Sequence, residues 1–159
     1  KFADRLIGIE FFPEGGKYYA DGHRACNLVW TPEQTLQQNG VCIVCDKPVT
    51  VGVLNRVLQL ADRTVLQAKK IMGIQYSIVP LCDILQRVLN VSASSKKVIE
   101  MYHHMLKNIG NEFHILLDAP YHTIVQYSSV EIALAIIKIR SGQVVVHPGY
   151  DGIYGRIEW

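Results

Sequence analysis

Four residues near the start of the chain have the types and the spacing of metal ligands. His23 and Cys26 are separated by two residues, and Cys42 and Cys45 repeat this spacing further along the chain. In such a two-knuckle arrangement, each tight turn presents two ligands to one ion. Thiolate and imidazole are donors that zinc prefers, so the pattern predicts one zinc ion bound by all four residues.

The expected role of this zinc is structural. Four protein ligands complete a tetrahedral shell and leave no position for a catalytic water. The ion would join two loops, and its removal should unfold at least the segment from Lys17 to Val49. Two alternatives stay open: Asp21 or Cys82 replaces His23 as a ligand, or the cysteines are reduced core residues that bind no metal.

The remaining residues predict no active site. His103 and His104 are neighbours on an expected helix and point about 100° apart, so they do not form a ligand pair. His114, His122 and His147 have no acidic residue at a metal-binding interval. Common phosphate-loop, zinc-protease and serine-hydrolase motifs are missing from the sequence. We therefore predict no catalytic residue in this chain.

A glycine-rich segment with two tyrosines runs from Pro148 to Gly155. Its N–H groups could receive a phosphate while Tyr150 or Tyr154 stacks on a base. The alternative, which we favour from the sequence alone, is a tight turn whose tyrosines pack on the core.

Composition indicates a folded globular protein. The chain has 159 residues, 49% of them hydrophobic, and a formal net charge of +2. This charge is too small to indicate a nucleic-acid binder by itself. The apolar stretch from Ile132 to Ile139 is too short to cross a membrane, and the few cysteines suggest a reducing, cytoplasmic environment. Because the chain opens with Lys1 and not Met, we expect a piece of a longer protein.

Hydrophobic periodicity predicts an α+β fold. We expect a strand over 9–12, a returning strand over 17–20, and helices over 53–62, 80–89, 94–110 and 128–140, with Ser94 and Ser128 as helix caps. The segment 63–77 stays unassigned. Strands over 113–117 and 144–146 would flank the last helix as a βαβ-like unit. Residues 1–62 would form a small zinc-knuckle, ribbon-like region, and residues 63–159 a mainly helical one.

Several motifs together resemble the endonuclease Q family. They are Glu10–Tyr18 (EFFPEGGKY), Asp21–Cys26 (DGHRAC), Cys42-x-x-Cys45, and Pro148–Gly155 (PGYDGIYG). Asp46 stands where the family commonly has a glycine, and 63–77 fits the family pattern poorly.

This resemblance implies a DNA-repair function for the longer protein. Such a protein would carry a PHP-type metal-dependent catalytic domain and would nick DNA at deaminated bases or abasic sites; bacterial relatives are often labelled helicases of the UvrD/Rep type. This chain would be its zinc-binding and carboxy-terminal region, without the PHP ligands and not active alone. We expect DNA as a partner, with Arg24, Lys47, Arg56, Tyr150 and Tyr154 as candidate contacts. The competing hypothesis is a structural zinc module that docks on a protein or another domain.

Overall fold

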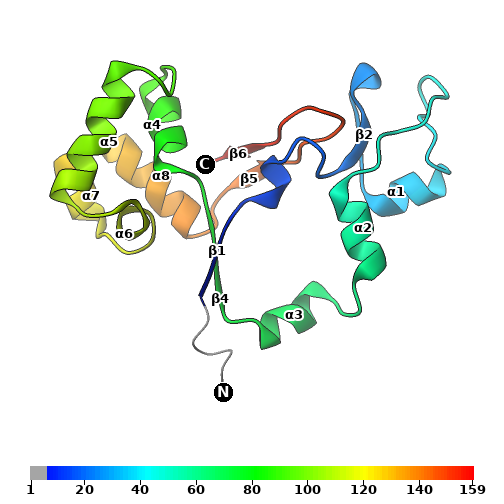
Figure 1. Ribbon diagram of the computed structural model, residues 1–159, viewed down its shortest axis with the longest axis horizontal. Helices are drawn as coiled ribbons and strands as arrows, with labels where there is room; N and C mark the ends of the chain where they lie inside the picture. The colour runs from blue at the N-terminus through cyan, green and yellow to red at the C-terminus, as the bar shows by residue number, and fades with distance from the viewer. Residues whose placement is uncertain (1–6) are drawn as a thin grey trace. The chain divides into compact units, whose positions relative to one another are not determined.

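A computed structural model describes residues 7–159 and confirms the α+β fold (Figure 1). Contacts between Cα atoms divide the chain into two compact units. We call Phe12–Gln75 with Val145–Glu158 the knuckle unit, and Tyr76–Val144 the helical unit. Strands β1 (Ile7–Phe11) and β4 (Ile74–Ile78) pair with each other, and each is divided between the two units.

The two units are not consecutive segments of the chain, unlike the predicted division after Asp62. Strands β5 (Val145–His147) and β6 (Arg156–Glu158) pair antiparallel and pack against the 3-10 turn η2 (Pro13–Gly15). These contacts place the end of the chain in the knuckle unit. Where independently folding domains begin and end stays a prediction.

The knuckle unit contains a β-hairpin and three short helices. Its remaining elements are β2 (Asp21–His23), the 3-10 turn η3 (Arg24–Cys26), β3 (Leu28–Trp30), α1 (Pro32–Gln37), α2 (Val53–Leu60) and α3 (Val65–Ile71). Thr31 begins α1 with a capping box, and Thr64 begins α3 in the same way. The predicted helix over 53–62 is confirmed as α2, and the unassigned segment contains α3 and the start of β4.

The predicted returning strand over 17–20 is wrong. This segment is a turn, and its carbonyl groups serve another purpose: Tyr18 O accepts from Val53 N at 2.9 Å, and Tyr19 O accepts from Leu54 N at 3.0 Å. The segment thereby satisfies N–H groups that the first turn of α2 cannot pair internally.

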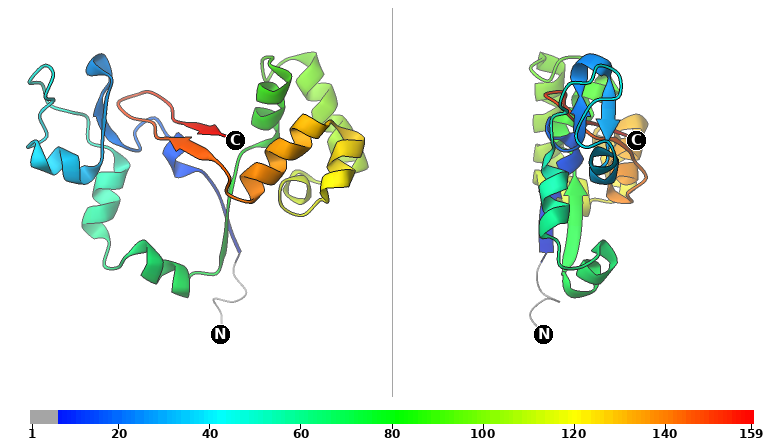
Figure 2. Two further views of the ribbon diagram at one scale, coloured as in Figure 1. Left: turned by 180° about the vertical axis from the view of Figure 1, so that it is seen from behind. Right: turned by 90° about the vertical axis from the view of Figure 1, so that its right-hand side faces the viewer.

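Five helices form the helical unit: α4 (Leu81–Leu89), α5 (Lys96–Asn108), α6 (Glu112–Leu117), α7 (Tyr121–Tyr127) and α8 (Val130–Arg140). Helix α8, orange in Figure 2, packs against α4 and α7, and α4 packs against α5. The predicted helices over 80–89, 94–110 and 128–140 are confirmed. Their serine caps are Ser95 and Ser129, each one residue later than predicted.

The predicted βαβ-like unit is wrong. Residues 113–117 lie in α6, which begins at the N-cap Asn111, whose side chain accepts from His114 N at 2.9 Å. The predicted strand over 144–146 exists as β5, but its partner β6 is antiparallel. The run of apolar residues is common to a buried strand and a buried helix, and the asparagine cap decides for the helix.

Within residues 7–159, no helix has the length and apolar character needed to span a membrane.

Candidate metal centre

The structure brings the four predicted ligands together. The ligand atoms of His23, Cys26, Cys42 and Cys45 all lie within 4.8 Å of one another. Ligands bound tetrahedrally to zinc at about 2.0 to 2.3 Å lie roughly 3.3 to 3.8 Å apart, so small side-chain movements would complete such a shell. The cluster could hold one metal ion.

The first ligand pair belongs to the β2–β3 hairpin. His23 ends β2 opposite Leu28, and η3 forms the turn that carries Cys26. Asn27 then takes the left-handed conformation at φ 50°, which asparagine tolerates better than most residues. The hairpin therefore fixes the separation of the first two ligands.

The second pair lies on a tight turn. Cys42 N donates to Lys47 O at 2.8 Å, and Asp46 N donates to Cys42 O at 2.9 Å. Asp46 has φ 57°, in the region that glycine enters without strain and that aspartate also visits. This conformation explains why aspartate can stand at the position where the family commonly has glycine.

Hydrogen bonds favour a thiolate at Cys42. Burial alone would raise the pKa of this fully buried thiol, but donors that include the N–H of Val44 and the ring of His23 lower it to about 6. A hydrogen bond to Cys45, together with burial, raises the pKa of Cys26 to about 12. Cys45 Sγ also lies 3.4 Å from His23 Nδ1. The backbone is thus arranged for the form of sulfur that binds metal.

The two alternative ligands are engaged elsewhere. Asp21 is fully buried, and its carboxylate accepts from Gly52 N at 2.6 Å and from Asn55 Nδ2 at 2.8 Å. Cys82 lies on α4 in the helical unit. Neither belongs to the four-residue cluster, so the geometry favours His23 as the fourth ligand.

The tyrosine loop is joined to the first knuckle. Tyr150 is 7% exposed, and its hydroxyl donates to Asn27 Oδ1 at 2.8 Å. Asp151 accepts from Thr50 Oγ1 and from Arg24 N, both at 2.6 Å, and these two bonds lower the pKa of its carboxyl. The structure therefore gives Tyr150 a packing role, whereas Tyr154 is 70% exposed.

The N–H groups of this loop do not form a phosphate cradle. Five of them donate to backbone carbonyls: those of Gly149, Tyr150, Gly152, Ile153 and Gly155. The glycine-rich segment is thus a tight turn, as the favoured interpretation of the sequence held.

Sequence reasoning missed the residues that anchor the loop, Asn27, Thr50 and Asp151. Their hydrogen bonds join residues more than one hundred positions apart. No local pattern could have revealed them.

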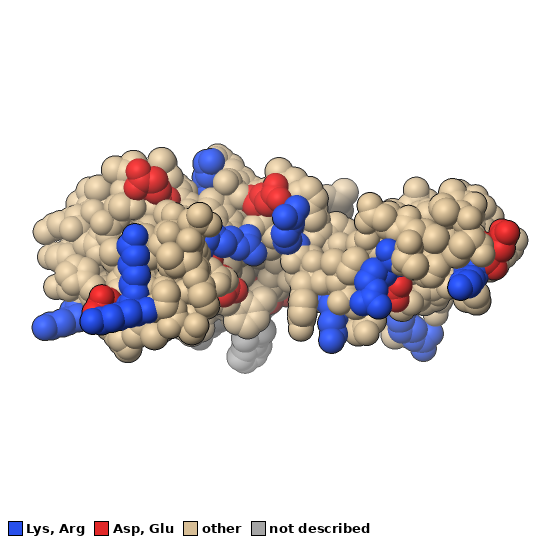
Figure 3. Space-filling model, turned by 90° about the horizontal axis from the view of Figure 1, so that it is seen from above, with Lys and Arg blue, Asp and Glu red and all other residues tan. Residues whose placement is uncertain are grey.

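The three basic candidates are exposed residues of the knuckle unit. Arg24 lies in η3, Lys47 follows the second knuckle, and Arg56 lies on α2 and donates to Gln59. On the face in Figure 3, basic and acidic side chains are interspersed over a largely uncharged surface. The positive charge is therefore dispersed and not gathered in one large patch.

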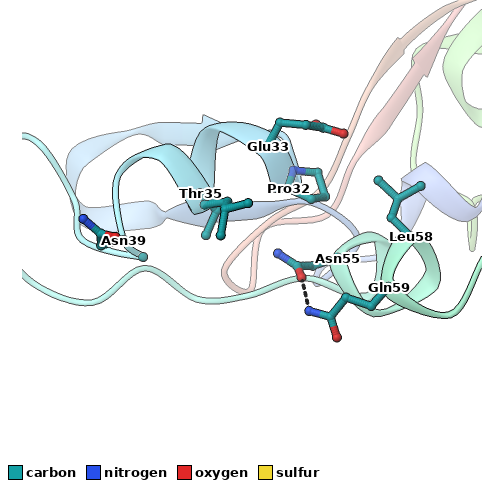
Figure 4. A pocket seen from close by; sticks show the side chains of 9 residues that line it. Pro32, Glu33, Thr35, Asn39, Asn55, Leu58 and Gln59 are labelled. Carbon is teal, nitrogen blue, oxygen red and sulfur yellow. Dashed lines mark hydrogen bonds between the residues drawn. The ribbon is translucent and has the colours of Figure 1, made fainter.

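An open pocket of about 490 Å³ lies between α1 and α2 in the knuckle unit. Figure 4 shows Pro32 and Thr35 of α1 on one side, with Asn55 and Gln59 of α2 hydrogen-bonded to each other on the other. Glu33 is its one titratable lining residue. A pocket with a single such group lacks the acid–base pair that general acid–base catalysis requires.

Two solved structures are similar to this chain over nearly its whole length. The lesion-specific endonuclease PfuEndoQ from Pyrococcus furiosus matches with a TM-score of 0.82 and 27% identity, over 94% of this chain and 37% of that one. An endonuclease Q in complex with a 27-mer duplex substrate, with an abasic lesion at the active site, matches with a TM-score of 0.76 and 25% identity, over 96% and 38%. The resemblance to endonuclease Q predicted from the sequence is confirmed.

A family model described as the MJ0043 C-terminal domain matches residues 80–143, within the helical unit. Protein MJ0043 of Methanocaldococcus jannaschii is 26% identical over 147 residues, which are 92% of this chain and 18% of that protein. The chain thus spans less than two fifths of the endonuclease Q structures and less than a fifth of MJ0043.

Proposed function

We propose that this chain is a non-catalytic, zinc-binding, DNA-engaging portion of an endonuclease Q-like protein. The observation that carries this proposal is the four-residue cluster, placed in a chain that is similar to an endonuclease Q bound to duplex DNA. By analogy with these relatives, the longer protein would nick DNA at deaminated bases or abasic sites.

The donor set supports zinc as the metal. Three sulfurs and one imidazole match a closed structural site, whereas magnesium and calcium prefer oxygen ligands. When bound, zinc would fix the hairpin turn that carries Cys26 to the turn that carries Cys42. The chain's own residues hold these turns close enough for that purpose.

The lack of a second metal cluster supports a non-catalytic role. Among residues 7–159, the cluster at His23 is the one group of three or more His, Cys, Asp or Glu side chains placed to hold a metal. Strand cleavage would then depend on the metal-dependent catalytic domain that the resemblance implies. The proposal assigns to this chain DNA contact through Arg24, Lys47, Arg56 and Tyr154.

Metal content and DNA binding of the purified chain test this proposal together. We expect one zinc per chain by mass spectrometry, lost or reduced in His23→Ala and Cys42→Ser. Cys82→Ser is the matched control, because this cysteine lies outside the cluster, and it should keep the metal. Binding to duplex DNA should weaken steeply as salt rises, since each phosphate contact releases counterions. A chain that folds without metal, or that binds no DNA at low salt, would contradict the respective half of the proposal.

Interdomain docking without DNA contact is the second candidate function. Helices α2 and α3 leave a set of apolar side chains more than half exposed: Val53, Val57, Leu60, Val65, Leu66 and Ile71. Apolar surface of this extent is typical of an interaction site. Zinc content without salt-dependent DNA binding would favour this alternative.

A further inference from the structure

The loop at the end of the knuckle unit forms a rigid base beside the turn that follows β1. Gly149 N donates to Glu14 O at 2.8 Å, Gly152 N to Lys17 O at 2.9 Å, and Gly155 N to Gly15 O at 3.0 Å. A Cβ atom at Gly155 would collide with Glu14 O, so the two segments approach as closely as backbone can. Side chains on this base therefore have fixed attachment points.

Two exposed tyrosines project from this base around a lysine. Tyr18 is 47% exposed and Tyr154 is 70% exposed. The Nζ atom of Lys17 lies 5.6 Å from the ring centroid of Tyr18 and 5.8 Å from that of Tyr154. Both distances are within the range of a cation–π interaction, so the lysine holds the two rings near each other.

A second cation lies at the same place. A Cβ atom built on Gly152 would be 3.6 Å from Arg24 Nη1 and 3.7 Å from the Tyr18 hydroxyl. Gly152 thus lies beneath both groups. We call Lys17, Tyr18, Arg24 and Tyr154 the tyrosine platform.

The tyrosine platform combines the two groups that recognise a nucleotide. Exposed aromatic rings stack on a base, and lysine and arginine pair with the phosphates beside it. Within a duplex, both faces of each base are covered by its neighbours, so a protein ring can stack only on a base that has left the helix or lies at an end. The platform therefore suits unpaired nucleotides better than intact duplex.

We propose that the tyrosine platform stacks on an unpaired nucleotide of bound DNA, with Lys17 and Arg24 on the adjoining phosphates. This inference rests on the proposed function and adds to it the state of the DNA that the loop contacts. It also separates the roles of the two loop tyrosines: Tyr150 holds the loop to Asn27, and Tyr154 meets the ligand.

The test is fluorescence titration of the purified chain with a single strand that carries 2-aminopurine, and with a blunt duplex of the same sequence. Stacking on tyrosine should quench the 2-aminopurine signal. Tyr154→Ala should weaken binding of the single strand about 5- to 100-fold, and the duplex less, because base–aromatic stacking contributes about 1 to 3 kcal/mol. Tyr154→Phe should retain the quenching, since the ring is kept.

Tyr121→Ala is the matched control, because this tyrosine is also exposed but lies on α7 in the helical unit. Tyr18→Ala supplies a second variant should Tyr154→Ala lose its metal, and it should also lower the affinity for the single strand. If the unmodified chain binds neither DNA, the proposed function fails. If it binds both and these alanine variants bind equally well, only the stacking inference is overturned. Equal losses in Tyr154→Ala and Tyr154→Phe would show a hydroxyl contact and also overturn stacking.

Discussion

The two units are stabilised in different ways. The knuckle unit has a small apolar cluster of Trp30, Cys42 and Val49, with two further ligand cysteines packed against it. The helical unit has a larger aliphatic core, whose fully buried members include Leu81, Ile84, Leu85, Val98, Met105, Ile115, Ile124, Ile132 and Ile136. The knuckle unit therefore requires a cross-link that the helical unit does not, and the metal cluster is placed to supply it.

Polar contacts differ between the units in the same sense. In the knuckle unit, Asp151 and Tyr150 bind residues more than one hundred positions earlier in the chain. In the helical unit, Arg140 donates to the carbonyls of Ile115, Leu116 and Ala119, each at 3.0 Å, and so satisfies the end of α6. The first set closes long loops, whereas the second completes a helix within a packed bundle.

Removal of the metal is the largest expected test of this comparison. A strong chelator should unfold the knuckle unit and leave the helical unit folded, because structural zinc in small modules contributes on the order of 10 kcal/mol. Hydrogen exchange measured by mass spectrometry should show lost protection across residues 20–50 and unchanged protection across 81–139. Zinc added back in excess is the control and should restore protection. Equal loss in both units would show that they share one folding unit.

A core truncation should give the opposite result with a smaller effect. Leu85→Ala removes a fully buried side chain from α4 and should lower the free energy of unfolding of the helical unit by about 2 to 5 kcal/mol. Leu134→Ala is the matched control, since this leucine of α8 is 46% exposed and its loss should change stability by about 0.5 kcal/mol or less. Chemical denaturation with metal content measured in parallel checks both. Metal loss in Leu85→Ala would contradict independent stabilisation.

The sequence predicts the helical unit and the ligands well because both depend on local spacing. The stripe from Val98 to Ile109 repeats at helical intervals, and each ligand pair lies within one turn. The segment 113–117 was wrong because five apolar residues fit a strand as well as a helix. The turn over 17–20 was wrong because its partners lie on α2, more than thirty residues later. Contacts across such distances leave no periodic pattern in the sequence.

The smallest expected effect concerns acid and distinguishes the units by the groups that titrate. Hydrogen bonding to the Ser129 side chain, and then to its own backbone N–H, lowers the pKa of Glu131 at the start of α8. A depressed folded-state pKa stabilises the helical unit above the unfolded value, here 4.5, and that contribution disappears as the pH falls through the folded-state pKa. Glu131→Gln should therefore reduce stability near pH 7 slightly and flatten its decline below pH 5, as measured by urea denaturation across this range. Glu100→Gln, at an exposed site in the middle of α5, is the control and should leave the slope nearly unchanged. Because the ligands of the knuckle unit must be deprotonated to bind metal, the metal should be lost in acid equally in both variants. A change in metal retention on substitution of Glu131 would mean that the two units titrate as one.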